Sequence, residues 1–378
     1  MVNLAVSGYT KKQVTDQLHG RSGSRGIVKF RYELLSKEDV KLGELKAQPG
    51  RVALNSLAEI KRTAVFQVTE QEEQDVDWLN DRIRPVFCLQ MPDGGWAEWP
   101  LGVFLLSSPT RKDENGQIKR SIEAYDGSLI LKEDKFTDRY FIPAGTKYTT
   151  AVIDILNAAG IWKINILDHD GTLATDLEFE IGTPKLYAVN ELLAAINYTS
   201  LWVDENGYFV AQPYVLPTDK DPEYEYRTDN LSIIHPDSTE ELDLFAVPNK
   251  WVRYVSNPDR EVVLRSEYTN DLSTSPTSTI NRGRAIVDVD DVEDIADQAT
   301  LNEYVKRIAY NASQVYGRFD FSTALMPHHS YYNCLFVEHT DFGIATKYME
   351  SSWAMDLRAM DLQAGGAMTH SCRRVIQI

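Results

Sequence analysis

A strand that passes directly into a helix constrains this fold more than any other feature of the sequence. The side chains from residue 118 to 125 (IKRSIEAY) alternate with a period of two, as a strand requires when its two faces meet different environments. Asp126 and Gly127 then end the strand. We expect the Asp126 carboxylate to cap a short helical turn over residues 129–131, because it can accept the unpaired amides that begin a helix.

A second, longer helix is expected shortly afterwards. Thr149 or Thr150 is placed to cap its start, and Gly160 is the residue type that commonly ends a helix. The period thus changes from two to helical within one segment, which predicts a β region joined to an α+β region. The apolar residues at helical spacing are Val152, Ile153, Leu156 and Ala159.

Before this segment, strand-sized pieces follow one another from residue 27 onward. Turn residues separate them at Gln48-Pro49-Gly50, at residues 92–95 (PDGG) and at Asn115-Gly116. This pattern predicts a β-barrel or a β-sandwich.

After the segment, helices and strands alternate over residues 131–225 and end in an expected hairpin around Asn206-Gly207. Strands return from residue 227, together with one helix expected over residues 291–312. The fold class is therefore α+β and predominantly β. The buried stripe of the last helix is expected to contain Ile295, Ala299, Tyr304, Ile308 and Ala312.

These changes of pattern predict four segments. A flexible N-terminal arm over residues 1–24 ends in Gly and Ser, and its removal is expected to leave the fold intact. A first β domain follows over 25–130, a small α+β domain over 131–226, and a second β domain with one helix over 227–378. A chain of 378 residues is long enough for two or three such cores.

Several phrases of the sequence resemble the tail hub family of long-tailed phages and related contractile injection systems. Within residues 122–160 they are IEAYDG, LKED, the pair Tyr140-Phe141, PAGTKYT and NAAG. The segment 348–376 is similar to the closing strand pair of that family, and residues 249–258 match more weakly. The resemblance spans most of the chain, and none of its motifs is catalytic.

The resemblance implies a particular architecture and role. Two tail-tube-like β-barrel domains would flank the small α+β domain, and a homotrimer would present six barrels to a hexameric tube. Such a hub closes the distal end of the tail tube, with a channel for DNA passage. Its implied partners are a distal tail or baseplate ring protein, the tail tube and tape-measure protein, and a tip spike or fibre. Its implied location is the virion tail, after synthesis in the host cytoplasm.

The charge of the chain opposes stable nucleic-acid binding. Fifty-six acidic and 39 basic residues give a formal charge of −17, and a phosphate-gripping protein needs the opposite balance. Acidic residues gather in the runs 70–77 and 288–297. We expect these runs to be solvated faces or helix first turns, or alternatively part of a repulsive channel wall. The sequence has no apolar run long enough to span a bilayer and no secretory signal at its start.

We assign no catalytic, cofactor-binding or metal-binding residue from the sequence. The glycine-rich segments 20–26 and 145–147 match no nucleotide or nucleophile motif. Residues 168–171 (DHDG) miss the calcium-loop register and are expected to form a hairpin turn. Glu223 and Glu225 share one face of a strand but have no other substrate site near them in the sequence.

The densest group of potential metal ligands is interpreted as structural, because its spacing fits no zinc motif. The three cysteines are expected to be buried free thiols. Members of the group are His328, His329, Cys334, His339, His370 and Cys372.

Two alternatives to a structural tail protein remain at this point. One is a cell-wall polysaccharide or peptidoglycan hydrolase on a β scaffold, for which the sequence offers no catalytic group. The other is a monomeric carbohydrate-binding β module that uses Trp96, Trp99, Trp202 or Trp353. Trp96 and Trp99 are expected on one side of a strand, as half-buried sheet aromatics.

Overall fold

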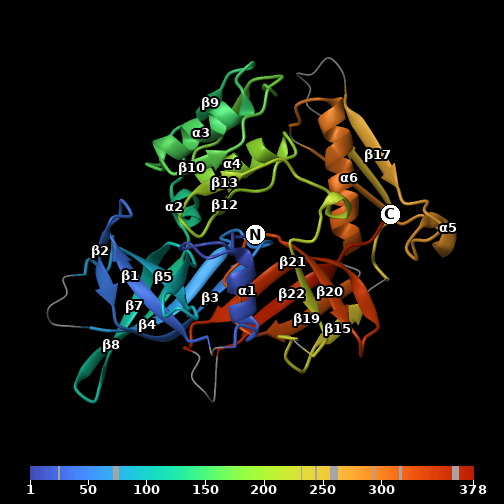
Figure 1. Ribbon diagram of the computed structural model, residues 1–378. Coiled ribbons are helices and arrows are strands. Elements are labelled where there is room, and N and C mark those ends of the chain that lie inside the picture. Colours follow the sequence, from blue (N-terminus) through green and yellow to red (C-terminus); the bar gives the residue numbers. More distant parts are fainter. Residues whose placement is uncertain are drawn as a thin grey trace.

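A computed structural model describes residues 1–378 apart from eight short gaps. The chain is predominantly β, with large antiparallel sheets and a smaller share of helix (Figure 1). The described helices are all too short or too polar to span a lipid bilayer. The gaps are residues 24–25, 71–75, 231, 243–244, 256–262, 293, 315–316 and 360–365.

The largest element of the fold is a 14-stranded sheet built from both ends of the chain. Its strand order is β15-β19-β22-β21-β3-β4-β8-β7-β5-β1-β2, with β20 beside β21, β14 beside β20 and β6 beside β5. The N-terminal half supplies β1 Val28–Leu35, β2 Lys41–Leu45, β3 Ala47–Asn55, β4 Arg62–Thr69, β5 Arg82–Gln90, β6 Trp96–Pro100, β7 Phe104–Glu114 and β8 Gln117–Tyr125. The C-terminal half supplies β14 Tyr224–Arg227, β15 Thr239–Leu242, β19 Gly317–Thr323, β20 Cys334–His339, β21 Ile344–Asp356 and β22 Met368–Arg374.

The two halves of this sheet meet where β21 pairs with β3 in antiparallel register. The ladder runs from the pair Ser352 and Asn55 to the pair Asp356 and Arg51. Among the described strands the pairing path is open, because no ladder joins β15 to β2. The predominantly β class is thus confirmed, whereas two separate closed barrels are not.

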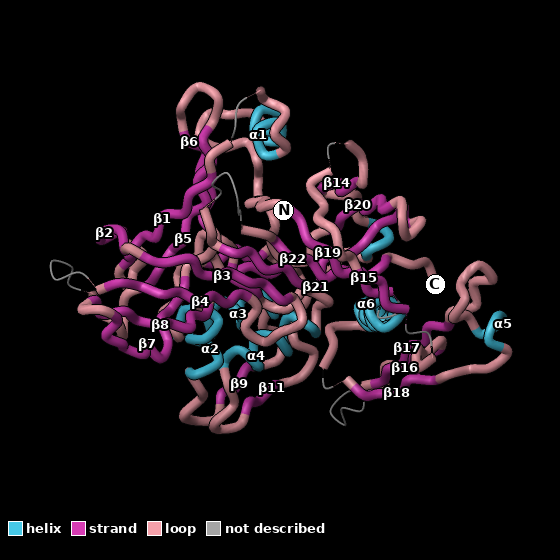
Figure 2. The backbone as a smooth tube through the Cα atoms, turned by 90° about the horizontal axis from the view of Figure 1, so that it is seen from below, coloured by secondary structure: helices cyan, strands magenta, loops and turns pink. Residues whose placement is uncertain are grey.

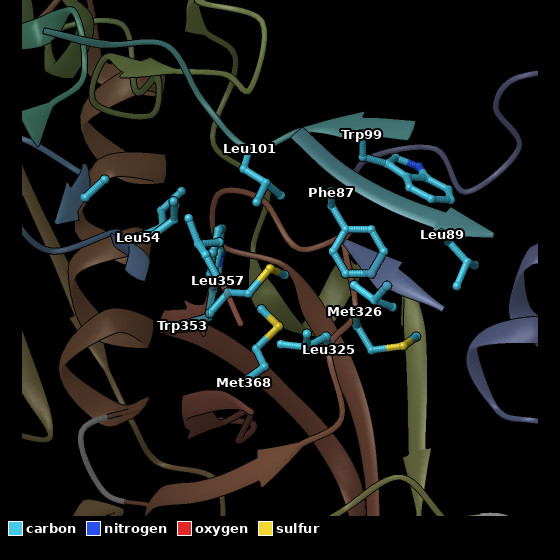
Figure 3. Packing of buried hydrophobic residues seen from close by; sticks show 14 of the residues in the cluster. Leu54, Phe87, Leu89, Trp99, Leu101, Leu325, Met326, Trp353, Leu357 and Met368 are labelled. Carbon is cyan, nitrogen blue, oxygen red and sulfur yellow. The ribbon is translucent and has the colours of Figure 1, made fainter. Parts of the chain in front are cut away.

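One hydrophobic core lies under both halves. Its members come from β1 to β8 and equally from β14 and β19 to β22. Burial of these side chains is the main favourable term in folding, so the two halves stabilise one another. Figure 3 shows part of this core, including Leu54, Phe87, Leu89, Trp99, Leu101, Leu325, Met326, Trp353, Leu357 and Met368.

The middle of the chain forms a small α+β unit above the sheet (Figure 1). Its hydrophobic core contains the inner faces of three helices, which pack on two small sheets. The expected hairpin at Asn206-Gly207 is confirmed, with Gly207 at φ +86°. The elements are α2 Ser128–Glu133, β9 Tyr140–Ile142, α3 Tyr148–Ala158, β10 Ile164–Ile166, β11 Leu177–Phe179, α4 Lys185–Ala194, β12 Trp202–Val203 and β13 Phe209–Ala211.

A third unit interrupts the C-terminal half. Strands β16 Lys250–Tyr254, β17 Arg265–Thr269 and β18 Val287–Asp291 form a separate sheet, and α6 Gln298–Gln314 packs against it. Figure 2 shows these strands beside α6 and away from the large sheet. Trp251 of β16 is fully buried in this small core.

Helix α6 begins later than the sequence pattern predicted. It starts at Gln298 rather than near residue 291, and Ala299 is exposed, so the predicted stripe is wrong at that position. Leu301, Val305 and Ala309 are fully buried instead. These three are spaced by four residues, and they set the inner face of the helix.

The strand-to-helix junction forms at the expected place, but the N-cap residue of α2 is Gly127 rather than Asp126. The Asp126 carboxylate accepts the amide N–H of Ser128, the first residue of α2, at 2.9 Å. It also accepts the backbone N–H of Arg62 at 2.8 Å, which ties the start of β4 to the end of β8. Asp126 is fully buried, and this burial raises the pKa of its carboxyl group.

The expected threonine cap of α3 is wrong. The helix begins at Tyr148 with Lys147 as its N-cap residue, and no side chain caps it. Thr149 lies inside the helix, and its hydroxyl donates to Asp168 instead. The expected end is confirmed, because Gly160 follows the C-cap residue with φ +77°.

The predicted turn at residues 48–50 is also wrong, because β3 continues through it. The register between β3 and β4 shifts between Gln48 and Arg51, so Pro49-Gly50 forms a bulge within the strand. Gly50 is required there, since a Cβ atom would lie 2.3 Å from the carbonyl oxygen of Val65. The turns at residues 92–95 and 115–116 are confirmed as connections between adjacent strands.

Trp96 and Trp99 lie on opposite faces of β6, because three positions separate them in a strand. The expectation of a shared side was therefore wrong. Trp99 is fully buried in the large core, and its Nε1–H donates to the carbonyl oxygen of Asn3 at 3.0 Å. Trp96 is half-buried, with Lys29 Nζ 3.8 Å from the centre of its ring.

The N-terminal segment packs on the large core instead of extending as a free arm. Leu4 and the fully buried Val14 of helix α1 Lys11–Leu18 belong to that core. Val2 N–H donates to the carbonyl oxygen of His328 at 2.9 Å. Because of these contacts, we expect removal of the first twenty residues to destabilise the fold.

We predict that Leu4→Ala lowers the free energy of unfolding by about 2 kcal/mol, because it leaves a cavity in a closed core. Chemical denaturation would measure the loss. Leu79→Ala is the matched control, since Leu79 is 89% exposed and its truncation should change stability by less than about 0.5 kcal/mol. Equal effects at the two positions would contradict the packed N-terminal segment.

We also predict that Gly127→Ala destabilises the junction between β8 and the middle unit by about 1–3 kcal/mol. The backbone at Gly127 is helical and accepts alanine, but the new Cβ atom would lie 2.8 Å from Phe209 Cζ. The cost should shrink in a Phe209→Leu background, which a double-mutant cycle measures. An unchanged cost there would show that the close approach of the ring is not its cause.

Candidate functional site

The densest cluster of titratable side chains lies inside the C-terminal half of the large sheet. Glu350 of β21, His370 of β22 and His329 of the loop before β20 meet there, and all three are buried. Their nearest ligand atoms lie within 4.8 Å of one another. The structure thus brings together two of the histidines singled out in the sequence and adds a carboxylate that was not.

The carboxylate of Glu350 joins the two imidazoles. Its Oε2 lies 2.7 Å from His329 Nδ1, and its Oε1 lies 2.6 Å from His370 Nδ1. The outer ring nitrogens meet hydroxyl groups: His329 Nε2 lies 2.6 Å from Tyr226 Oη, and His370 Nε2 lies 2.9 Å from Thr323 Oγ1. One network therefore connects β14, β19, β21, β22 and the loop.

Burial dominates the protonation behaviour of the cluster. It lowers the pKa of His329 to about 3 and that of His370 to about 4, because the interior disfavours the charged imidazolium. It raises the pKa of Glu350 for the same reason. All three groups are thereby biased towards their neutral forms.

The other potential metal ligands identified in the sequence lie outside this cluster. His328 is fully buried beside it, with its ring centre 4.6 Å from that of His329. His339 and Cys334 lie on β20 and do not join the three ligand atoms. The three cysteines are buried and free, as expected.

Sequence reasoning missed Glu350, Tyr226 and Thr323. Glu350 lies in a long strand, and its neighbours Met349 and Ser351 are also buried. The alternation of buried and exposed positions therefore did not identify Glu350 as a site residue. A usable signal was the acid itself within an apolar strand that faces His370, because a buried carboxylate requires a hydrogen-bonding partner.

Glu223 and Glu225 do not form a catalytic pair. Glu223 accepts hydrogen bonds from Asn333 Nδ2 and from the backbone N–H of Cys334. Burial disfavours its ionised form, but these donors and the Met1 amino group outweigh burial and lower its pKa. Glu225 is instead paired with Arg227 at 2.7 Å on the surface.

Residues 168–171 (DHDG) form a loop that pairs with Lys147 of the same chain, rather than the expected hairpin turn. Lys147 Nζ lies 3.0 Å from Asp168 and 3.1 Å from Asp170. The Lys147 bond holds the pKa of Asp168 below its ordinary value. The expectation failed because β10 pairs in parallel with the distant β13 instead of turning back on the next strand.

The described part of the glycine-rich segments is accounted for by turns rather than by a nucleotide-binding loop. Gly145 has φ +82° in the turn before α3, and Lys147 then serves as the helix N-cap residue. Within residues 20–26, positions 24 and 25 lie outside the described residues.

The first acidic run is only partly described, since residues 71–75 lie in a gap. Glu70 accepts hydrogen bonds from Arg111, at 2.8 Å, and from Arg120. The first residue of the run is therefore paired with side chains of β7 and β8, whereas Asp77 at its other end accepts hydrogen bonds from the Leu79 N–H and from Asn80 Nδ2.

The second acidic run has two structural roles. Asp288 on β18 pairs with Arg253 at 3.0 Å. Asp297 accepts the N–H of Thr300 at 2.7 Å, and this bond lowers the pKa of Asp297 as expected at the start of a helix.

A polar cavity of about 470 Å³ lies between the middle unit, the N-terminus and the loop before β20. Trp202 lines it and stacks on Tyr331, with ring centres 5.1 Å apart. Glu205 also lines it, and burial raises the pKa of this carboxyl group. Trp353, by contrast, is buried in the large core, so two of the four tryptophans considered for saccharide binding, Trp99 and Trp353, face the interior.

Comparison with solved structures identifies the fold. No family model matches the sequence, and no curated protein matches it. The tail protein from Neisseria meningitidis MC58 aligns with a TM-score of 0.63 over 92% of this chain and 97% of its own, at 11% identity. The 43 kDa tail protein of prophage MuSo2 from Shewanella oneidensis aligns with a TM-score of 0.61 over 91% and 98%, also at 11% identity.

A chain of the PdpA–VgrG complex from Francisella is similar as well. It aligns with a TM-score of 0.55 over 96% of this chain and 55% of its own length, at 8% identity. This protein therefore has the fold of phage tail proteins and of VgrG-type tail components. The resemblance drawn from residues 122–160 and 348–376 is confirmed at the level of the fold.

The buried cluster generates a prediction about acid stability. Between the unfolded pKa of histidine near 6.5 and the folded values of His329 and His370, the unfolded state binds protons that the folded state does not. Stability should therefore fall as the pH drops through this window, by about 2 kcal/mol from pH 7 to pH 5 for each of the two histidines. The raised pKa of Glu350 acts in the opposite sense and offsets part of the loss at the acid end.

Denaturation at several pH values, in the presence of a metal chelator, measures this effect. His370→Gln should flatten the acid dependence, whereas His235→Gln should leave it unchanged, since His235 is exposed and outside the cluster. A dependence that is identical in wild type and His370→Gln would assign the acid sensitivity to other groups.

Proposed function

We propose that this chain is a structural protein of a phage tail or of a related contractile injection system, located in the virion tail or its equivalent. The observation that carries the proposal is the match in fold over nearly the whole length of two bacterial tail proteins. The proposal assigns no catalytic residue and no cofactor to the chain.

Within that class, the proposed role is a homotrimeric hub that closes the distal end of the tail tube. The proposed units are residues 25–130 and 227–378 as two tube-like domains, with residues 131–226 as the insert and residues 1–24 as an N-terminal segment. Three copies would present six tube-like units to a hexameric tube, which satisfies the symmetry of the contact. The β3–β21 ladder supports this arrangement, because it holds the two units of one copy side by side.

The proposed assembly contacts are exposed apolar side chains on two parts of the molecule, because apolar groups that gather on a surface mark interaction sites. Proposed partners are a second and third copy of this chain, the tail tube and tape-measure protein, a distal tail or baseplate ring protein, and a tip spike or fibre. On the middle unit the exposed residues are Phe141, Trp162, Leu167, Ile181 and Tyr208, and around β15 to β18 they are Leu242, Val263, Ile280, Val287 and Val289.

The negative charge of the chain suits a channel through which DNA passes. DNA carries about one negative charge per 1.7 Å of its axis. An acidic wall repels these phosphates over a Debye length of roughly 8 Å, so the duplex stays centred and free to slide. We place part of the excess acid of this chain, which has a formal charge of −17, on that wall, with the runs 70–77 and 288–297 as candidates.

We predict that the purified protein assembles into trimers, alone or with its tail partners. Native mass spectrometry and electron micrographs of the particles measure this, and rings of threefold symmetry are the expected result. A chain that stays monomeric at micromolar concentration even beside tail partners would contradict the hub. A monomer that binds saccharide would instead support a carbohydrate-binding module, and hydrolysis of cell-wall polymers would support the hydrolase.

We further predict that the protein binds duplex DNA only weakly at physiological salt, because its negative net charge repels the phosphates. Fluorescence anisotropy with a labelled duplex measures the affinity, and a basic DNA-binding protein serves as the positive control. Tight retention of DNA by the trimer would contradict the repulsive channel but would leave the hub itself standing.

A further inference from the structure

The cluster of His329, Glu350 and His370 has the composition of a metal site. Two imidazole nitrogens and one carboxylate oxygen converge from three separate backbone segments, and the side chains of the three residues are fully buried. Imidazole and carboxylate are ligands that Zn²⁺ takes in proteins. A chance surface grouping of acids has neither the burial nor the nitrogen donors.

Among the described residues, no cationic side chain belongs to the cluster, and the Met1 amino group, which is hydrogen-bonded to Glu223, acts on it only through space. Among the described residues, the only hydrogen-bond partners of the Glu350 side chain are the two imidazoles, and no Lys or Arg pairs with it. A buried carboxylate without a cation is costly. A divalent ion between the three groups would stabilise the ionised carboxylate, which burial otherwise disfavours.

The outer nitrogens of both imidazoles are already held in the way that metal-ligating histidines require. His329 Nε2 meets Tyr226 Oη at 2.6 Å, and His370 Nε2 meets Thr323 Oγ1 at 2.9 Å. In known metal sites, a hydrogen bond at the far nitrogen fixes the ring and directs the other nitrogen to the metal. Here it directs both Nδ1 atoms towards Glu350.

His328 provides a separate observation. It is fully buried and packs against His329, and neither of its ring nitrogens has a partner among the described residues. An unsatisfied buried imidazole signals a bound water molecule or ion close by. His328 lies next to the cluster, with its ring centre 4.6 Å from that of His329, although its nitrogens are not among the three converging ligand atoms.

We propose that His329 Nδ1, His370 Nδ1 and the Glu350 carboxylate bind one divalent transition-metal ion, with Zn²⁺ as the best match to the donors. Ligands at about 2.0–2.1 Å from a tetrahedral ion lie roughly 3.3 Å apart. The separations in this structure are 2.6 and 2.7 Å, which are hydrogen-bonding distances at which each pair of atoms shares a proton. Binding therefore displaces protons and moves each ligand pair apart by about 0.6 Å.

The ion would have a structural role. It would pin β21 and β22 to the loop before β20, next to the place where the two halves of the sheet meet. No solvent path or substrate is required for that role, which fits the complete burial of the three side chains.

The test uses the full chain, unfolded and freed of metal with a chelator and then refolded in the presence of Zn²⁺, because the three side chains are fully buried in the folded chain. We expect about one Zn²⁺ per chain by elemental analysis, and a higher melting temperature with Zn²⁺ than with Mg²⁺. Co²⁺ should give the visible absorption of a low-coordinate site. These three measurements use wild-type protein, so they stand even if a variant fails to fold.

Glu350→Gln keeps the shape of the side chain and should weaken Zn²⁺ binding at least about 10-fold. His339→Gln is the matched control, a buried histidine on β20 outside the cluster, and should bind as wild type does. Absence of stoichiometric Zn²⁺ from wild type together with an unchanged melting temperature would overturn the proposal, and the cluster would then be a hydrogen-bond network alone. Equal affinity in Glu350→Gln and wild type would also overturn it.

Discussion

The ladder between β3 and β21 is the constraint on which the rest of this structure depends. It pairs residues 51–55 with 352–356, and it places strands from both ends of the chain in one sheet over one core. The segments between β8 and β14 and between β15 and β19 leave this sheet and return to it. The middle unit and the unit around α6 are therefore insertions into a β domain that both ends of the chain form together.

The points of departure are fixed by specific contacts. Asp126 closes β8 by binding the amides of Arg62 and Ser128, and Gly127 leaves room for the ring of Phe209. Residues 125–127 thus join the sheet to the middle unit: Asp126 binds the sheet, and Gly127 packs against the middle unit. On the return side, Glu223 binds Asn333 and Cys334 just before β14 enters the sheet.

Local features of this fold could be predicted from the sequence, and distant ones could not. The alternation in β8, the turn at residues 115–116 and the end of α3 at Gly160 depend on neighbouring residues, and they were expected correctly. The bulge at Pro49-Gly50 looked like a turn because its partner strand is not visible in local sequence. Likewise, Glu350 meets His370 only through a strand pairing, so no spacing rule could reveal the cluster.

The β3–β21 ladder also has a consequence for how the chain is made. About 300 residues separate the paired strands, and synthesis at about 5–20 residues per second delays β21 by roughly 15–60 s after β3 emerges. During that interval one edge of β3 and one face of the N-terminal half have no native neighbour. Pairings this distant in sequence form slowly, and the waiting edge is open to other strands. Yield in the cell should therefore be governed by protection of the nascent N-terminal half rather than by the stability of the finished fold.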